Sequence, residues 1–333
     1  MPKRISWKKG MRLTDEVLRA SDACTAEYIS QALRMAGNGR LGLLPSSRPF
    51  KVQLSITKGF VDVEALDCLA ITTGGNLIDA HFDTKFTNTF ESRVQIPAVS
   101  DANEYILTIN ALPDNWHESA DGYMEQDYTF SLLDAKSTLP DTAMPIARII
   151  NDNGWQEDAA NFVPPCLCIA AHSKFEELHS KFLQILTSID DTTRKTLKDT
   201  CVRTAISIYW PVVMQMMSTA NTEHDAMTPQ RLMACVQRVV GSFAMACELD
   251  ELINLEDAAI FRNYSLSPYN YRIAYIRIKQ GLGMCYSISE KVEKFSLLKP
   301  EPKIVPQPQV VPEPPKPVTP KPDPRRAWEG KKI

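Results

Sequence analysis

The stretch "NFVPPCLCIAAHSKFEELHSKF", residues 161–182, decides the fold because the apolar period changes within it. Cys166 and Cys168 stand one residue apart, and His172 and His179 follow. All four are residue types that ligate zinc, yet no Cys-x-x-Cys pair is present to complete a tetrahedral site. In an extended conformation both faces of the segment around the two cysteines are apolar. We therefore predict no metal site here, but a buried strand that leads into a helix.

On the N-terminal side, from about residue 51 to residue 170, apolar residues mostly alternate with polar ones, as they do in strands. The segment "AITTGGNLIDAHF" contains two such runs joined at Gly74 and Gly75. Two glycines accept the positive φ angles that a tight hairpin requires. A phosphate-binding loop would need a following Lys-Ser pair and a helix, and neither follows. We predict a β-hairpin at these glycines.

On the C-terminal side the period becomes helical, and two seams with the a/d spacing of a heptad appear. The first seam comprises Phe175, Leu178, Phe182 and Ile185, and the second Leu232, Val236, Val239 and Phe243. Thr228 and Pro229 are typical of an N-cap and first helical position. Pro211 is expected to kink or end an apolar helix between the seams. Such stripes need partner helices, which a second chain or this chain itself would supply equally well.

Helices that follow a block of strands, without βαβ alternation, indicate an α+β fold with segregated layers. The 333 residues are 44% hydrophobic and 23% charged, as in soluble globular proteins. A net charge of −3 offers no global field that would attract nucleic acid or anionic lipid. We find no apolar run long enough to cross a bilayer and no secretory signal. A cytoplasmic protein without membrane insertion is expected, with its cysteines reduced.

The last change in composition lies at the C-terminus, where residues 300–324 contain 11 of the 23 prolines. Such a segment cannot pack a core and is expected to be disordered and extended, in the polyproline II conformation. It is followed by the basic motif "DPRRAWEGKKI", with Arg325, Arg326 and Trp328. Neither basic terminus carries the interleaved aromatic residues of a nucleic-acid platform. The motif is either a protein-binding bait on a tether or a tail without a partner.

Several segments, in the same order, resemble the TssK family, baseplate subunits of bacterial type VI secretion systems. They are "ISWKKGMRL", "LGLLPSSRPFKVQLS", "LDCLAITTGGNLIDA", "MPIARIINDNGWQEDAANFVPPCLCIAAHSKFEELHSKFLQIL", "MTPQRLMACVQRVVGSFA" and "SPYNY". Two features depart from the family. "TDEVLRASD" replaces the usual helix sequence after the opening, and the proline-rich tail stands where the family has a C-terminal head domain. The chain thus resembles a shortened, divergent member.

The resemblance implies a β-sandwich shoulder over residues 1–171 and an α-helical bundle neck over 172–298, and the composition adds the disordered proline-rich tail over 299–333. It implies a homotrimer bundled through the two neck seams, which binds the TssF and TssG wedge subunits. The expected function is structural, linking the baseplate to the membrane-associated export complex, with the tail motif as contact to a membrane-complex protein. An alternative in the same class is a phage or phage-like tail adaptor.

No catalytic residue, cofactor or metal is expected, because no nucleophile elbow, metal-ligand pair or phosphate loop supports an enzyme. For wedge binding we expect Trp7, Met11 and Leu13 to be anchors, because an exposed tryptophan buries a large area and loses little rotamer entropy. Trp7 could equally be a lid on the β core.

Overall fold

The computed structural model describes residues 8–36, 40–57, 59–83, 92–97, 102–118, 124–196, 203–249 and 255–295. The chain divides into two units, Met1–Leu298 and Lys299–Ile333. The tail motif of Arg325, Arg326 and Trp328 lies outside the described residues, and so does Trp7.

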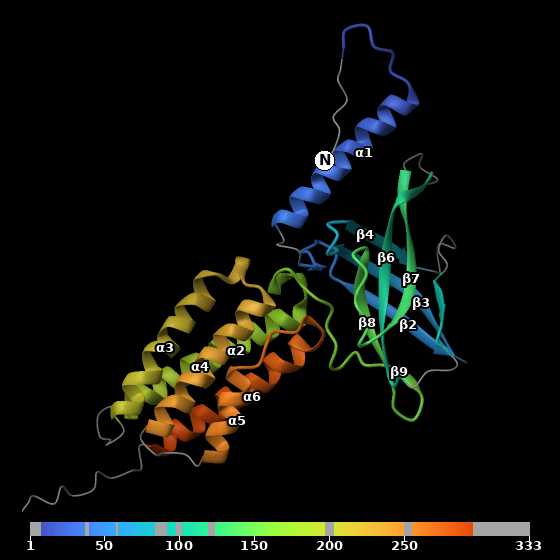
Figure 1. Ribbon diagram of the computed structural model, residues 1–333. Helices are drawn as coiled ribbons and strands as arrows, with labels where there is room; N and C mark the ends of the chain where they lie inside the picture. Colours follow the sequence, from blue (N-terminus) through green and yellow to red (C-terminus); the bar gives the residue numbers. More distant parts are fainter. Residues whose placement is uncertain are drawn as a thin grey trace, which may run out of the picture. The chain divides into compact units, whose positions relative to one another are not determined.

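Two antiparallel sheets form the first part of the described chain (Figure 1). The first comprises β1 (Gly42–Leu43), β2 (Lys51–Thr57), β3 (Phe60–Ile71), β4 (Leu77–Asp83) and β5 (Arg93–Gln95). In it, β3 pairs with each of the other four strands. The second comprises β6 (Glu104–Glu118), β7 (Met124–Asp134), β8 (Ala143–Asn151) and β9 (Trp155–Glu157), in the order β7-β6-β8-β9.

The alternation along the strands places one face of each sheet in a common core. Val61 and Val63 of β3 and Leu107 of β6 are completely buried. The rings of Phe82 on β4 and Phe130 on β7 meet edge to face at 5.8 Å and join the two sheets. The predicted strands are confirmed, and so is the hairpin, since β3 and β4 are joined through Gly75 at φ +81°.

The predicted buried strand around Cys166 is wrong. Leu43 and Cys166 form a single parallel bridge, and the chain then enters a 3-10 turn, η1 (Ile169–Ala171). The amide of Ile169 donates to the carbonyl of Met227 at 2.8 Å, which turns the chain toward the helices after one bridge. This long-range hydrogen bond leaves no trace in the local apolar period.

In the described part of the chain a helix, α1 (Asp15–Ala36), precedes the strands, and five more follow them. These five are α2 (Ser173–Thr196), α3 (Arg203–Thr222), α4 (Pro229–Leu249), α5 (Leu255–Ser265) and α6 (Ala274–Phe295), with the 3-10 turns η2 (His224–Ala226) and η3 (Tyr271–Ile273) between them. The predicted N-cap is confirmed, because the Arg231 amide donates to Thr228 Oγ1 at 3.1 Å. The fold is α+β, as the order of periods predicts.

Of the two outcomes expected at Pro211, a kink or the end of a helix, the second is excluded, since α3 continues through it to Thr222. A proline inside a helix costs about 3 kcal/mol. Tyr209 and Val213 on either side are completely buried, and their packing offsets that cost.

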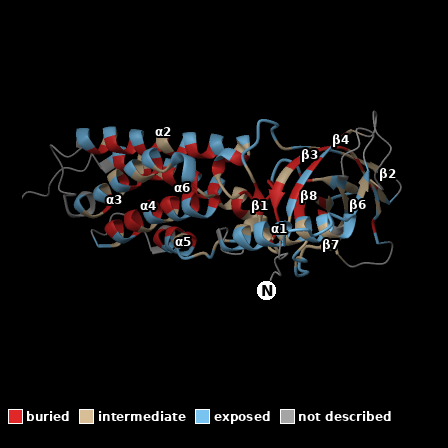
Figure 2. Cartoon of the chain, turned by 90° about the horizontal axis from the view of Figure 1, so that it is seen from above, coloured by how far each residue is buried: buried red, intermediate tan, exposed pale blue. Residues whose placement is uncertain are grey.

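The two apolar seams are buried inside the bundle of α2 to α6 (Figure 2). All eight seam residues are at most 3% exposed: Phe175, Leu178, Phe182, Ile185, Leu232, Val236, Val239 and Phe243. Helix α4 packs against α3, α5 and α6, and α2 packs against α3 and α6. The expectation that these seams face a second chain is therefore corrected, because helices of the same chain already cover them.

Among the described helices, α4 alone is long and apolar enough to cross a membrane. It is also the helix with the most neighbours in the bundle, and Leu232, Val236 and Phe243 on it are completely buried. Burial in the core of the bundle therefore explains why α4 is so apolar.

Candidate functional site

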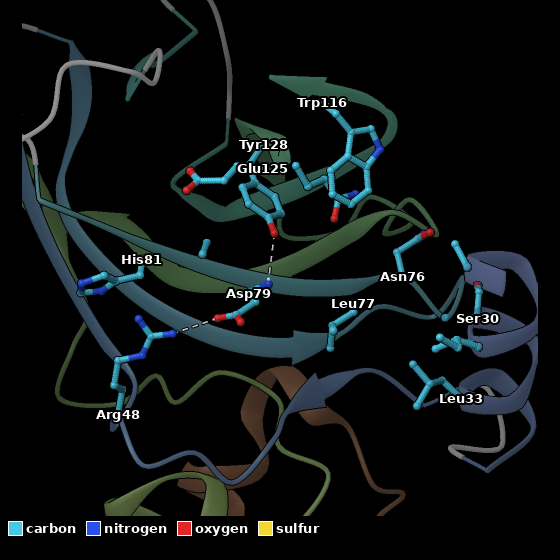
Figure 3. A pocket seen from close by; sticks show the side chains of 15 residues that line it. Ser30, Leu33, Arg48, Asn76, Leu77, Asp79, His81, Trp116, Glu125 and Tyr128 are labelled. Atoms are coloured by element: carbon cyan, nitrogen blue, oxygen red, sulfur yellow. Dashed lines mark hydrogen bonds and ion pairs between the residues drawn. The ribbon is translucent and has the colours of Figure 1, made fainter. Parts of the chain in front are cut away.

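A groove of about 720 Å³ lies between α1, β4 and the ends of β6 and β7 (Figure 3). Helix α1 contributes Ala26, Ile29, Ser30 and Leu33, whose spacing places them on one helical face. Most of α1 is exposed, and the Ile29 side chain in the groove is 52% exposed. The groove thus has a wall of apolar side chains that the described residues leave partly exposed.

The C-terminal half of α1 is fixed to the hairpin between β3 and β4. Ser30 Oγ donates to the Gly74 carbonyl at 3.2 Å, and the Ser30 carbonyl lies directly above Gly75. A Cβ atom at Gly75 would collide with that carbonyl. Arg34 adds an ion pair with Asp141 at 3.7 Å, but both side chains are exposed, so the pair contributes little.

Strand β4 forms the floor of the groove. Among the described strands it pairs with β3 alone, so its other edge faces the groove without a partner strand. The Asp79 amide on that edge donates to the Tyr128 hydroxyl at 3.1 Å, and its carboxylate accepts from Arg48 at 3.1 Å. Burial raises the pKa of Tyr128, which keeps this phenol neutral. Leu77, at the start of the strand, is 44% exposed.

The hairpin of β6 and β7 supplies the remaining wall and is strongly acidic. Residues 104–134 contain seven carboxylate side chains and no lysine or arginine. Of its two aromatic residues in the groove, Trp116 and Tyr128, Trp116 is 50% exposed. His117 lies between two carboxylates, with Nδ1 2.8 Å from Asp127 and Nε2 3.8 Å from Glu125. The groove therefore combines exposed apolar side chains with an excess of negative charge.

Of the wedge anchors that the sequence suggests, Met11 and Leu13 lie just before α1 and do not line the groove. Met11 is 38% exposed and Leu13 is 68% exposed, so both are accessible to a partner. Trp7 lies outside the described residues, and the choice between an anchor and a lid stays open.

Three of the four cysteines and histidines of the deciding stretch make hydrogen bonds within the chain. Cys166 Sγ contacts the Pro164 carbonyl at 3.3 Å, and His172 Nδ1 accepts from the Lys174 amide at 3.2 Å. His179 Nε2 donates to the Ala220 carbonyl at 3.0 Å. Burial lowers the pKa of His179 and brings that of His172 to about 4. Within the described ranges, no group of three or more His, Cys, Asp or Glu side chains is arranged to hold a metal ion.

Sequence reasoning missed the groove, although two signals for it are present. One is the absence of lysine and arginine across β6 and β7, and the other is the spacing of Ala26, Ile29 and Leu33 on α1. Neither signal shows that the two segments meet, because they are about 90 residues apart in the chain. The tertiary fold brings them together.

No family model matches this sequence, and no curated protein matches it in sequence. Its fold matches TssK from the type VI secretion system of EAEC, solved with nanobody nb18, at 14% identity and a TM-score of 0.55, over 82% of this chain and 99% of that one. It also matches a chain of the type VI secretion system TssK-TssF-TssG baseplate subcomplex, at 15% identity and a TM-score of 0.54, over 87% and 99%. A crystal structure of TssK matches at 11% identity and a TM-score of 0.57, over 88% of this chain and 69% of that one. The chain has a TssK-like fold.

Proposed function

We propose that this chain is a structural adaptor in the baseplate of a type VI secretion system, located in the cytoplasm, where it links the baseplate wedge to the membrane-associated export complex. The observation that carries the proposal is the TssK-like fold, which spans both the sheets and the helical bundle. One of the matching structures is a complex with TssF and TssG, and we take these two proteins as the partners. The role requires no catalysis.

Co-expression of the full chain with TssF and TssG from the same host tests the proposal. A stable complex that survives gel filtration is the expected result. If both partners are soluble and neither elutes with the chain, the adaptor role is wrong.

For wedge binding we keep Trp7, Met11 and Leu13 as anchors. Replacing Met11 and Leu13 together by serine should abolish capture of TssF and TssG, because exposed apolar anchors contribute most of the energy at such contacts. Trp7→Ala should do the same without changing the thermal melt. A loss of stability in Trp7→Ala would favour the lid instead. Met35→Ser, at an 83% exposed position on α1, is the matched control and should leave capture intact.

For the homotrimer we propose the outer face of the bundle, since its seams are already buried. Met245 and Leu249 on α4 are 53% and 63% exposed, and Leu266 after α5 is 75% exposed. They are the kind of apolar surface that association covers. Light scattering should give about three times 37.4 kDa for the full chain. Met245→Glu combined with Leu249→Glu should give the monomer mass, and Met35→Glu should not.

For the proline-rich tail we propose that Arg325, Arg326 and Trp328 contact a membrane-complex protein. Three tethered copies on a trimer would raise the effective concentration of a weak motif. Deleting residues 300–333 should leave wedge capture intact and block secretion, and Trp328→Ala should reproduce much of that loss. Secretion at the parental rate after the deletion would show that the motif has no such role.

A further inference from the structure

The groove between α1, β4 and β7 has apolar side chains on opposite sides that remain half exposed. Ile29 on α1 is 52% exposed, Leu77 on β4 is 44% exposed, and Trp116 on β6 is 50% exposed. All three line the same hollow of about 720 Å³. Apolar surface that is gathered in one concave place is typical of a ligand or protein contact rather than of the general surface.

The shape of the groove selects an extended occupant. Its floor is the outer edge of β4, a strand of seven residues that pairs with β3 alone among the described strands. In an antiparallel edge strand every second residue directs its amide away from the paired strand, and in β4 the amide of Asp79 does so, because it donates to the Tyr128 hydroxyl. Leu77 and His81 lie two residues to either side of Asp79, so their amides point to the same edge. An added strand would pair with the amides of Leu77 and His81, take the place of the Tyr128 hydroxyl at Asp79, and direct alternate side chains to the two walls.

The charge of the groove selects a basic occupant. Its one arginine, Arg48, is bound to Asp79 at 3.1 Å, so this pair adds no net charge. Glu125 remains at the rim with a 59% exposed side chain, beside Asp127 and the exposed Glu118 on the paired strand. His117 lies between Asp127 and Glu125, and no lysine or arginine occurs in residues 104–134. Lysine or arginine on a bound strand would therefore meet an excess of carboxylates over cations among the described residues of this hairpin.

We infer that this groove binds an extended basic segment of a partner protein, laid along the outer edge of β4, with apolar side chains between Ile29 and Trp116 and cationic ones toward Glu118 and Glu125. The inference rests on the proposed adaptor role in one respect: that role makes the partner a component of the baseplate assembly. Binding itself is a property of this chain and is measured without any other baseplate protein.

The test begins with a random dodecapeptide phage library selected on the full-length chain. The recovered peptides should carry net positive charge and alternate apolar with polar residues. The strongest peptide is then synthesised and its Kd measured by fluorescence anisotropy. Recovery of only neutral or acidic peptides, or of none, overturns the inference.

Two variants locate the binding site of that peptide. Ala26→Trp fills the groove from the exposed face of α1 and should raise the Kd at least about tenfold, or about 1.4 kcal/mol. Ala20→Trp, on another face of the same helix, is the matched control and should leave the Kd unchanged. Equal affinities of the two variants would place the peptide elsewhere and contradict the inference.

Charge and strand pairing have separate readouts. Glu118→Lys combined with Glu125→Lys should weaken binding and flatten its salt dependence, whereas Glu290→Lys on α6 should do neither. Hydrogen exchange should show slower exchange in residues 77–83 when the peptide is bound. Unchanged exchange there would exclude strand addition.

Wedge capture then separates this inference from the adaptor role. Peptide binding without capture of TssF and TssG would leave the groove assignment standing and count against the proposed function. If the wild type captures TssF and TssG but binds no peptide in the groove, the proposed function stands and the groove assignment is wrong.

Discussion

The helical bundle of α2 to α6 and the helix α1 differ in how far their apolar side chains are exposed. In the bundle, Phe182 of α2 and Phe243 of α4 are completely buried by helices of the same chain. On α1, Ile29 and Leu18 remain 52% and 46% exposed, and the helix is fixed mainly where Ser30 meets the hairpin glycines. An apolar stripe therefore predicts that a helix will be covered, but it does not identify what covers it.

The largest expected effect concerns the covered region. Ile185→Ala on α2 removes a side chain that is 1% exposed and leaves a cavity among tightly packed helices. We expect the free energy of unfolding to fall by about 2–5 kcal/mol, as for other buried isoleucines. Urea unfolding followed by circular dichroism measures the change. A loss below about 1 kcal/mol would mean that the bundle is much less tightly packed than its burial indicates.

The second prediction concerns the contact between Ser30 and Gly75, which fixes α1 to the hairpin. Gly75→Ala places a Cβ atom on a residue with φ +81° and against the Ser30 carbonyl. The left-handed conformation alone costs about 1–2 kcal/mol. The collision should in addition detach α1, which limited proteolysis within residues 15–36 would detect.

Gly59→Ala is the matched control for Gly75→Ala. Gly59 has nearly the same angle, φ +83°, but nothing lies within 4 Å of an added Cβ. It should lose a similar free energy from backbone strain without faster cleavage of α1. Faster cleavage in both variants would mean that the contact with Ser30 does not hold the helix.

The third prediction uses acid to weaken the start of the bundle, where the His172 ring contacts that of Phe50 at 5.9 Å. Burial lowers the pKa of His172, just before α2, from 6.5 to about 4, and Lys174 adds to the shift. As the pH falls below 6.5 the unfolded chain binds this proton first, so the free energy of unfolding decreases until about pH 4, where the folded chain binds it too. Urea midpoints at pH 7 and pH 5 measure the decrease.

His172→Asn serves as the control, because asparagine can still accept the Lys174 amide but does not titrate. Its midpoint should fall less between pH 7 and pH 5 than that of the wild type. The rate of proteolysis within α1 should not follow this difference. If the urea midpoint falls equally in both proteins between pH 7 and pH 5, protonation of His172 is not the cause of the decrease.

The smallest effect is expected when an isoleucine is replaced by alanine on α1, where the side chain is half exposed. Ile29→Ala on α1 removes the same atoms as Ile185→Ala, but from a side chain that is 52% exposed. We expect a change within about 0.5 kcal/mol, because no cavity is created. A loss comparable to that of Ile185→Ala would show that α1 is packed more tightly in solution, and that the groove is closed.

Much of the fold could be predicted from the sequence where the signal is local. Gly74 and Gly75 predicted the hairpin, and Thr228 with Pro229 predicted the start of α4, because turn and cap chemistry depends on adjacent residues. The strand prediction failed at Cys166 because a distant residue decides there: the Ile169 amide donates to the Met227 carbonyl. At Pro211 only one of the two expected outcomes is excluded, the end of the helix, because α3 continues through it with buried residues on both sides.

The candidate site was less accessible to prediction than the fold. Met11 and Leu13 could be named from their types, and their exposure agrees with a role as anchors, which stays a prediction. The groove could not be named, because Ile29 and Trp116 belong to segments whose separate patterns contain no information about their distance.

The sequence by itself determined the order of strands and helices, the hairpin, the cap and the membership of both apolar seams, since each depends on the periodicity or chemistry of neighbouring residues. Only the tertiary structure decided which surfaces cover those seams and which apolar side chains stay open. That choice depends on which segments far apart in the chain come into contact, and hydrophobic attraction, being non-directional, does not specify it. The seam residues from Phe175 to Phe243 consequently lie inside their own bundle, while α1 keeps an open groove beside β4.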